Sequence, residues 1–419
     1  MSIAIKDARI PGYKNKSDLV IKDGVIASIS GSEDGDTVID AQGKYLVPGF
    51  VNTHTHAAMS LFRGYADDLP LHQWLNDKIW PLEAKLTSED VYWGTKLACL
   101  EMIKSGTVAF NDMYFFMESA ADAVIDMGMK GVLSYGMIDL GDRDKLESEM
   151  DKTMDFISYL EGKENVEPAL GPHSVYTVSE DGLSRCSELS KKMGIPIHLH
   201  LAETKKEMDD FRSQYPGYKN ITDYLDELGL LNDRLIAAHC VWLEEDDISR
   251  MGDTGAVVSH NPVSNMKLGV GKPLDYRAMV KNNVQVTLGT DGCASNNNLD
   301  LTESVKIAAL QQKLSGDTTL LTAQEGYDML TKNGAKALKT GGGAIVEGMS
   351  ADIILVDTSV RGTPGHNIMS DIVYSLQGGD VTDVIIDGKI VMRDRYVQGQ
   401  EDIIREATSR AKKLVNEVK

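Results

Sequence analysis

The chain has 419 residues, a length that suits one large domain plus a smaller one. Hydrophobic residues make up 42% and charged residues 25%, which is typical of a globular protein. Its formal net charge of −20 repels phosphate backbones and anionic lipid, so we expect no nucleic-acid partner and no membrane partner. The four cysteines form no CxxC pair, and no apolar run has the length of a signal peptide or a membrane span, so we expect a cytoplasmic protein.

The two ends of the chain share a pattern of short, β-branched segments. IAIKDARI, SDLVIKDGVIASI and DTVIDAQGKYLV predict strands separated by turns in the first 47 residues. The same pattern returns in ADIILVD and DVIIDGKIVMRDRYV, and EDIIREATSRAKKLVNEVK then predicts an amphipathic closing helix. We therefore expect a small β-sandwich domain built from residues 1–47 and 344–419, with the closing helix in the second piece.

The middle of the chain, residues 48–343, alternates short apolar runs with helical patterns such as SEDVYWGTKLACLEMIKS. The strand candidates are residues 49–56, 106–112, 131–137, 166–173, 195–201, 235–240, 256–261 and 284–291. Eight parallel strands with helices between them predict an α/β fold, a (β/α)8 TIM-like barrel. A doubly wound open sheet is the alternative, but it would need a glycine-rich phosphate turn, and the sequence has neither GxGxxG nor GxxxxGK[ST].

Most of the histidines follow these predicted strands. Six of the nine lie at or just past a strand's carboxyl end: His54, His56, His173, His200, His239 and His260. In barrel enzymes this end of the strands carries the active site. Satisfied core histidines would explain one or two of these positions, and the whole set predicts a catalytic centre.

Residue types and spacing single out a metal site. His54 and His56 are two apart on one strand, so both side chains point to the same side. His198 and His200 also share a face, and we expect the outer His200 to be a ligand and His198 to lie in the core or behind the ligands. Asp291 ends an apolar run, where a carboxylate is paired or metal-bound unless it caps the following helix.

Three imidazoles and one carboxylate leave a coordination position open for water, as in a catalytic site. The ligand types favour Zn²⁺, with Fe²⁺ and Mn²⁺ as alternatives, and a bound water would have a pKa of about 7. Glu203 follows three residues after His200, where it could exchange protons with a substrate, or be a solvated loop glutamate. HExxH and the HxE…PCxxC signature of another zinc deaminase fold are absent.

Longer segments resemble a known family. PGFVNTHTH, HLHLAET, AAHCVWL, SHNPVSNMKLGVG and TLGTDGCASNN are similar to the amidohydrolase superfamily. MSLFRGYADDLPLHQWLNDKIWPLEAKL, NDMYFF and ALGPHSVYT resemble the 5′-methylthioadenosine/S-adenosylhomocysteine deaminases, and GMIDL and FNDMYFF resemble their archaeal 5′-deoxyadenosine deaminase branch most. The family implies one metal ion, whereas binuclear relatives use a lysine on a middle strand. The third and fourth strand candidates, GVLSYGM and VEPALGPH, contain no lysine.

The resemblance implies a reaction and a role for each site residue. The metal ligands would be His54, His56, His200 and Asp291. A metal-bound hydroxide would replace the amino group of 5′-modified adenosines, including 5′-deoxyadenosine, S-adenosylhomocysteine, 5′-methylthioadenosine and adenosine, and release ammonia and the inosine analogue. Glu203 would protonate N1 of adenine, Asp291 would accept a proton from the metal-bound water, and His239 would hydrogen-bond the attacking oxygen.

The resemblance also implies how the nucleoside is bound. His173 would contact the purine and Glu83 would accept hydrogen bonds from the ribose, although the sequence alone also allows Glu83 to be a helix-surface residue. Arg143 or Arg63 could meet the carboxylate of S-adenosylhomocysteine, or Arg143 could form a surface ion pair. An apolar pocket for the 5′ group could instead come from Met59, Phe115, Phe116 and Met117, which are otherwise core residues.

Two other functions remain open at this stage. A related barrel could act on a free base or a triazine, as guanine or cytosine deaminases and chlorohydrolases do, and would then have no ribose for Glu83 to bind. A non-catalytic barrel scaffold would be expected to lose metal ligands, and all four are present here. Family members are often dimers or tetramers, so we expect a homo-oligomer.

Overall fold

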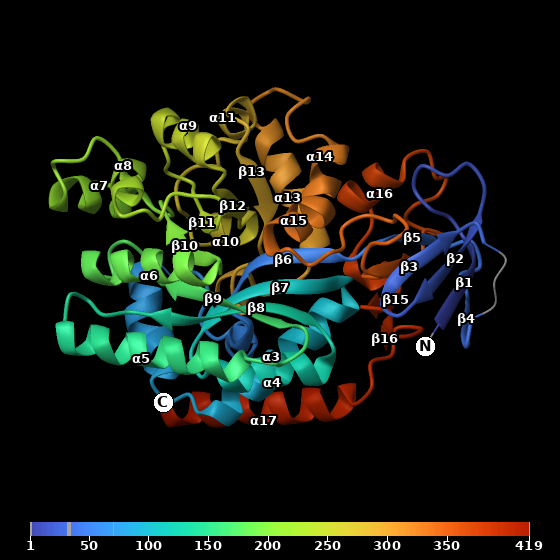
Figure 1. Ribbon diagram of the computed structural model, residues 1–419, viewed down its shortest axis with the longest axis horizontal. Coiled ribbons are helices and arrows are strands. Elements are labelled where there is room, and N and C mark those ends of the chain that lie inside the picture. Colours follow the sequence, from blue (N-terminus) through green and yellow to red (C-terminus); the bar gives the residue numbers. More distant parts are fainter. Residues whose placement is uncertain (1, 32–34, 70, 419) are drawn as a thin grey trace.

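The computed structural model describes residues 2–31, 35–69 and 71–418 and contains a barrel flanked by a smaller β-domain (Figure 1). The ends of the predicted domain pieces at Met1 and Lys419 lie outside the described residues. None of the helices in the described part of the chain is both long enough and apolar enough to cross a lipid bilayer.

The barrel consists of eight strands that pair in parallel in chain order. They are β6 (Phe50–Thr55), β7 (Thr107–Tyr114), β8 (Lys130–Met137), β9 (Val166–Pro172), β10 (Ile197–Leu201), β11 (Leu235–His239), β12 (Val257–His260) and β13 (Gln285–Leu288). Past β13, the backbone N–H groups of Thr290 and Asp291 donate to the His54 carbonyl at 3.2 and 3.0 Å, which joins the last strand to the first. The predicted barrel and its eight strand positions are confirmed.

Helices surround the barrel. The longer ones are α3 (Ser88–Lys104), α4 (Met117–Met127), α5 (Arg143–Leu160), α6 (Glu180–Met193), α7 (Lys205–Gln214), α8 (Ile221–Glu227), α9 (Glu245–Thr254) and α13 (Leu301–Lys313). Shorter turns are η1 (Ala57–Phe62), α1 (Leu71–Trp74), η2 (Leu75–Ile79), α2 (Trp80–Glu83), α10 (Pro262–Lys267), α11 (Tyr276–Lys281), α12 (Cys293–Asn296), α14 (Ala323–Asp328), η3 (Met329–Asn333), α15 (Gly334–Leu338), α16 (Ile368–Tyr374) and η4 (Gly378–Asp380). Polar caps set several starts; Thr87, for example, accepts from the backbone N–H of Asp90 and so begins α3.

The small domain is a sandwich of two four-stranded sheets. One sheet has the order β3 (Val25–Ile29), β2 (Ser17–Lys22), β1 (Ser2–Ala8), β4 (Thr37–Asp40), and the other β16 (Lys389–Met392), β15 (Val381–Ile386), β14 (Ile353–Val356), β5 (Tyr45–Pro48). Antiparallel pairing of β5 with β14 joins the two chain ends. Ile5, Leu19, Leu46 and Ile353 are buried in one apolar core between the sheets. The predicted sandwich built from both ends is confirmed.

The closing helix α17 (Gln400–Val418) lies along the barrel, beside α3 (Figure 1). Arg410 of α17 forms ion pairs with Glu89 and Asp90 at the start of α3. Ile403 and Ala407 on its apolar face are buried in the core of the barrel. The boundaries 1–47, 48–343 and 344–419 remain our proposal for the domains, with α17 reaching from the last piece onto the barrel.

The third strand begins at Lys130, one residue earlier than predicted, so the expectation that this strand contains no lysine is wrong. The Lys130 amine binds the carboxylates of Asp352 and Asp387, each at 2.7 Å, and both carboxylates belong to the small domain. Lys130 is the first residue of β8, and the histidines lie at the carboxyl ends of the strands. Its amine is therefore held at the opposite end of the barrel.

Candidate active site

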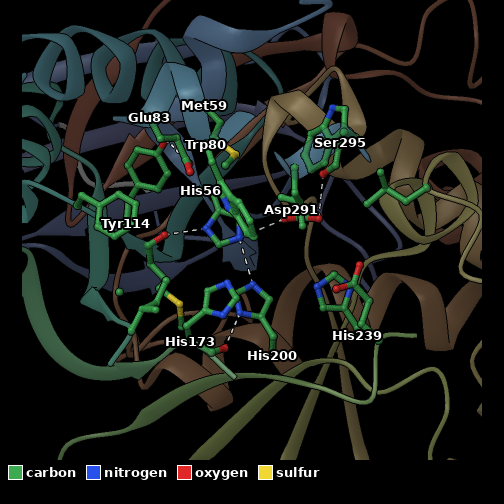
Figure 2. Close-up of a pocket in the computed structure, with 18 of the residues that line it drawn as sticks. His56, Met59, Trp80, Glu83, Tyr114, His173, His200, His239, Asp291 and Ser295 are labelled. Atoms are coloured by element: carbon green, nitrogen blue, oxygen red, sulfur yellow. Dashed lines mark hydrogen bonds and ion pairs between the residues drawn. The ribbon is translucent and has the colours of Figure 1, made fainter. Parts of the chain in front are cut away.

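The carboxyl ends of the strands surround a pocket that contains most of the predicted site residues (Figure 2). Those lining it are His56, Glu83, His173, His200, Glu203, His239 and Asp291. His54 is fully buried, and its ring lies 4.9 Å from each of the rings of His56 and His200, measured between centroids. His198 is also fully buried, behind His54. The structure thus brings together residues from β6, β9, β10, β11 and the end of β13.

Hydrogen bonds fix the orientation of three histidines. Each Nδ1 has a partner at 2.7 Å, which is His198 Nε2 for His54, the Met113 carbonyl for His56 and the His173 carbonyl for His200. A carbonyl oxygen only accepts, so the Nδ1 atoms of His56 and His200 carry the proton and their Nε2 atoms are bare. This arrangement is typical of histidines that bind a metal through Nε2.

The bare nitrogens face one another and Asp291. His56 Nε2 lies 3.2 Å from His200 Nε2 and 3.3 Å from Asp291 Oδ1 (Figure 2). Asp291 Oδ1 also lies 3.4 Å from His54 Nε2. His54 Nε2 is buried without a hydrogen-bond partner. Lone pairs at these distances repel unless a cation lies between them. The donor set therefore fits one divalent metal ion, and overlapping triads, His54–His56–Asp291 and His54–His200–His239, have ligand atoms within 4.8 Å of one another.

The electrostatics favour the metal-binding protonation states. Burial lowers the pKa of His54 to about 3 and holds the pKa of His200 well below its ordinary value. Burial opposes charge on Asp291 too, but the neighbouring His54 and His56 hold its pKa well below the usual range. Neutral imidazoles and an ionised carboxylate are the forms that bind metals.

Two serines hold Asp291. The hydroxyls of Ser264 and Ser295 donate to its Oδ2 at 2.6 and 2.9 Å, while Oδ1 faces the histidines. The N-cap of the following helix α12 is Gly292, so Asp291 does not serve as that cap. The two serines therefore hold the carboxylate with Oδ1 directed at the histidines.

Glu203 and His239 lie side by side in the pocket. Glu203 Oε1 is 3.9 Å from His239 Nδ1, which also contacts Asn265 Oδ1 at 2.8 Å. Burial raises the pKa of Glu203, so this carboxyl keeps its proton to a higher pH than an exposed glutamate. Burial opposes protonation of His239, but the carboxylates of Glu203 and Asp291 raise its pKa. A carboxyl whose pKa is raised is better suited to general acid catalysis than an exposed one.

Glu83 occupies another wall of the pocket. It is the last residue of α2, and its Oε1 accepts a hydrogen bond from the Tyr114 hydroxyl at 2.8 Å. Burial raises the pKa of Glu83 to about 7. Glu83 is thus a half-buried carboxyl that faces the pocket and not a helix-surface residue.

Comparisons with known proteins agree with this architecture. The model of the amidohydrolase family matches residues 45–391. The chain belongs to the amidohydrolase family. It is 51% identical to a 5′-deoxyadenosine deaminase of Methanoregula boonei, over 91% of this chain and 87% of the relative. It is 47% identical to 5-methylthioadenosine/S-adenosylhomocysteine deaminase 1 of Archaeoglobus fulgidus, over 98% and 99%. A crystal structure of an adenosine deaminase from Xanthomonas campestris with bound zinc has a TM-score of 0.92 and 31% identity, covering 99% of this chain and 98% of that one.

The structure of this amidohydrolase does not bring the two candidate arginines into the pocket. Arg143 is exposed at the first residue of α5, and Arg63 is held by an ion pair with Glu101 and by the Asn297 carbonyl. Among the described residues that line the pocket there is no lysine or arginine. Its charged side chains are therefore carboxylates and histidines.

The rest of the lining is mostly apolar and aromatic. It comprises Met59, Trp74, Leu75, Trp80, Met113, Tyr114, Phe115, Ile138, Tyr176 and Leu268, together with Gly136 and the polar Ser295. Of the apolar residues predicted from the sequence, Met59 and Phe115 line the pocket, whereas Phe116 caps α4 and Met117 lies in the core. Sequence reasoning missed Trp80 and Tyr114. Trp80 lies one helical turn before Glu83, and this spacing could have identified it.

The backbone of this amidohydrolase is strained around the site. Ala202, His239, Cys240 and Asp291 have φ angles of +50°, +72°, +53° and +64°, the left-handed region that non-glycine residues disfavour. Each such residue costs on the order of 1 kcal/mol, and such residues cluster at functional sites. The strain lies at the ends of β10, β11 and β13, where the predicted catalytic residues are.

Proposed function

We propose that this amidohydrolase is a metal-dependent aminohydrolase that converts 5′-modified adenosines to the inosine analogues and ammonia. The observation that carries the proposal is that two half-buried carboxyls, Glu203 beside His239 and Glu83 on another wall, line one aromatic pocket. An adenosine has a basic ring nitrogen for the first and ribose hydroxyls for the second. The names of the similar archaeal proteins support the same substrate class.

The proposed metal ligands are His54, His56, His200 and Asp291. A divalent ion bound there supplies a Lewis acid and an acidified water, with a pKa of about 7 in zinc enzymes. Zinc is the ion that we expect, because nitrogen and oxygen ligands suit it and the similar Xanthomonas deaminase binds it. Fe²⁺ and Mn²⁺ suit the same ligands.

Glu203, Asp291 and His239 bind or transfer the protons of the reaction. Glu203 protonates N1 of the adenine ring, which makes C6 electrophilic, and the oxygen of water then bonds to C6. Asp291 accepts a proton from the attacking water, while His239 hydrogen-bonds the attacking oxygen. The C6–N6 bond breaks once the amino group has received the proton held by Asp291, and ammonia leaves. The proton of the added hydroxyl returns Glu203 to its acid form as the C6 carbonyl forms. Two carboxyls with opposite pKa shifts, raised for Glu203 and lowered for Asp291, suit these separate roles.

The lining also indicates which 5′ groups are accepted. Glu83 accepts hydrogen bonds from the ribose hydroxyls and His173 contacts the purine. No lysine or arginine is among the described lining residues, and the lining carboxylates repel a further carboxylate. We therefore expect 5′-deoxyadenosine and 5′-methylthioadenosine to be better substrates than S-adenosylhomocysteine.

The test is a comparison of substrates by ultraviolet absorbance, which follows conversion of adenine to hypoxanthine. We expect 5′-deoxyadenosine to have the highest kcat/KM, and the Arg143→Ala variant to have the same kcat/KM as the wild type for S-adenosylhomocysteine. Failure of the metal-loaded protein to convert any of the four adenosines would overturn the function. If S-adenosylhomocysteine had the highest kcat/KM and Arg143→Ala abolished that advantage, only the proposed 5′ preference would be overturned.

A further inference from the structure

Helix α7 begins directly after Glu203, and its start departs from ordinary helix capping. Thr204 is the N-cap, and its hydroxyl accepts from the backbone N–H of Glu207 at 3.1 Å. In a capping box, the glutamate at this third position accepts a hydrogen bond from the backbone N–H of the N-cap. Glu207 instead reaches past Thr204, and its two oxygens accept from the N–H groups of Ala202 and Glu203, each at 2.8 Å.

The same Thr-x-x-Glu sequence behaves differently at α14. Glu325 Oε2 returns to its own N-cap and accepts from the N–H and the hydroxyl of Thr322, both at 2.7 Å. Capping alone therefore does not require the reach of Glu207. At α7 the carboxylate is used to bind the segment that carries Glu203.

This use of Glu207 is costly for the fold. Glu207 is 7% exposed, and none of the described lysines or arginines forms an ion pair with it. Burial raises its pKa to about 7. A buried carboxylate without a cation is unfavourable, and the two charge-assisted hydrogen bonds from backbone N–H groups offset part of that cost.

The segment that Glu207 binds is itself strained. Ala202 has a φ of +50°, and the N–H of Trp242 donates to its carbonyl at 2.8 Å. The Glu203 carboxylate, in contrast, makes no hydrogen bond to another described residue, and its nearest charged partner is His239 at 3.9 Å. The position of the Glu203 carboxyl therefore depends on how its backbone is held.

We propose that Glu207 is a positioning residue for the reaction, because its carboxylate fixes the Ala202–Glu203 backbone at the place from which Glu203 delivers a proton to the substrate. This inference rests on the proposed function. Glu207 does not touch the reacting atoms, and its effect passes through Glu203.

The test compares Glu207→Gln with a matched control, Glu325→Gln. A glutamine has one acceptor oxygen, so it satisfies one of the two N–H groups and presents its own NH₂ to the other. A misplaced catalytic group costs about 10- to 100-fold, so we expect kcat of Glu207→Gln to fall by that factor. KM and the metal content per chain should stay at the wild-type values. Glu325→Gln disturbs an equivalent helix start and should keep the wild-type kcat.

A double-mutant cycle separates positioning from a structural role. If Glu207 acts through Glu203, then Glu203→Gln and Glu203→Gln/Glu207→Gln have the same residual kcat, within about twofold. Should Glu207→Gln fail to fold, Glu207→Asp replaces it in the cycle. The aspartate side chain has two acceptor oxygens but is too short to reach both N–H groups. Glu207→Asp should therefore lower kcat when Glu203 is present, and not in the Glu203→Gln background.

Three results would overturn the inference alone: wild-type kcat in Glu207→Gln and Glu207→Asp, a loss of bound metal that accounts for the lower rate, or a further loss of kcat in the Glu203→Gln background. A metal-loaded wild type that deaminates no adenosine would overturn the proposed function and this inference with it.

Discussion

Replacement of Glu83 by glutamine tests whether the pocket binds a nucleoside or a free base. Glutamine has nearly the same shape as glutamate, and the Tyr114 hydroxyl can still donate to its oxygen. The change removes the negative charge that would strengthen hydrogen bonds from the two ribose hydroxyls. Hydrogen bonds to charged groups contribute about 1 kcal/mol more than neutral ones. Two weakened bonds amount to about 2 kcal/mol, which is about a 30-fold rise in KM.

The assay is steady-state deamination with adenosine and with 2′,3′-dideoxyadenosine, which lacks both hydroxyls. We expect Glu83→Gln to raise KM for adenosine and to leave KM for the dideoxy substrate unchanged. The pKa of Glu83 is raised to about 7, and the ionised form binds ribose better. The wild-type KM for adenosine should therefore rise as the pH falls below about 7, and the variant should lack that dependence. An unchanged KM for adenosine would refute this reasoning and favour the free-base alternative.

The other predictions concern the proton donor, the metal and the fold. Glu203→Gln should fold normally and lose about 10²- to 10⁴-fold in kcat. The kcat of the wild type should fall as the pH rises through the raised pKa of Glu203. Near-full activity of Glu203→Gln would show that Glu203 does not transfer the proton. His200→Ala should lower the metal content measured by plasma emission spectrometry together with the activity; full metal occupancy would exclude His200 as a ligand. Lys130→Met leaves the buried Asp352 carboxylate without its closest cation. The free energy of unfolding, measured by urea denaturation, should fall by about 3–5 kcal/mol. A loss below about 1 kcal/mol would show that Lys130 is dispensable.

The barrel and the positions of its histidines could be predicted because two local signals coincide. An apolar run followed by a polar side chain marks the end of a buried strand, as in LIAA before His239. Parallel strands bring such ends to one face, so His54, His200 and Asp291 meet although they are far apart in the sequence. His198, which was expected to lie in the core or behind the outer histidines, is fully buried and contacts His54.

Contacts that depend on loops could not be predicted in the same way. Ser264, Ser295 and Asn265 reach Asp291 and His239 from short helices after the strands, and no spacing rule connects them. The amphipathic pattern of the closing helix predicted that one face is buried, but not that it packs on α3. Glu83 has helix-surface spacing in the sequence, and its burial follows from the pocket that Tyr114 and the aromatic residues form around it.

The hydrogen bonds that orient His54, His56 and His200 differ in their sensitivity to mutation of the partner residue. His56 and His200 are held by main-chain carbonyl oxygens of Met113 and His173, which every amino acid possesses. Side-chain replacements at those two positions therefore leave the anchoring atoms in place. His54 depends on an imidazole, that of His198, so a single nucleotide change can delete its anchor. Of the three anchors, only that of His54 can be removed by a side-chain replacement, and it belongs to a residue that does not line the pocket.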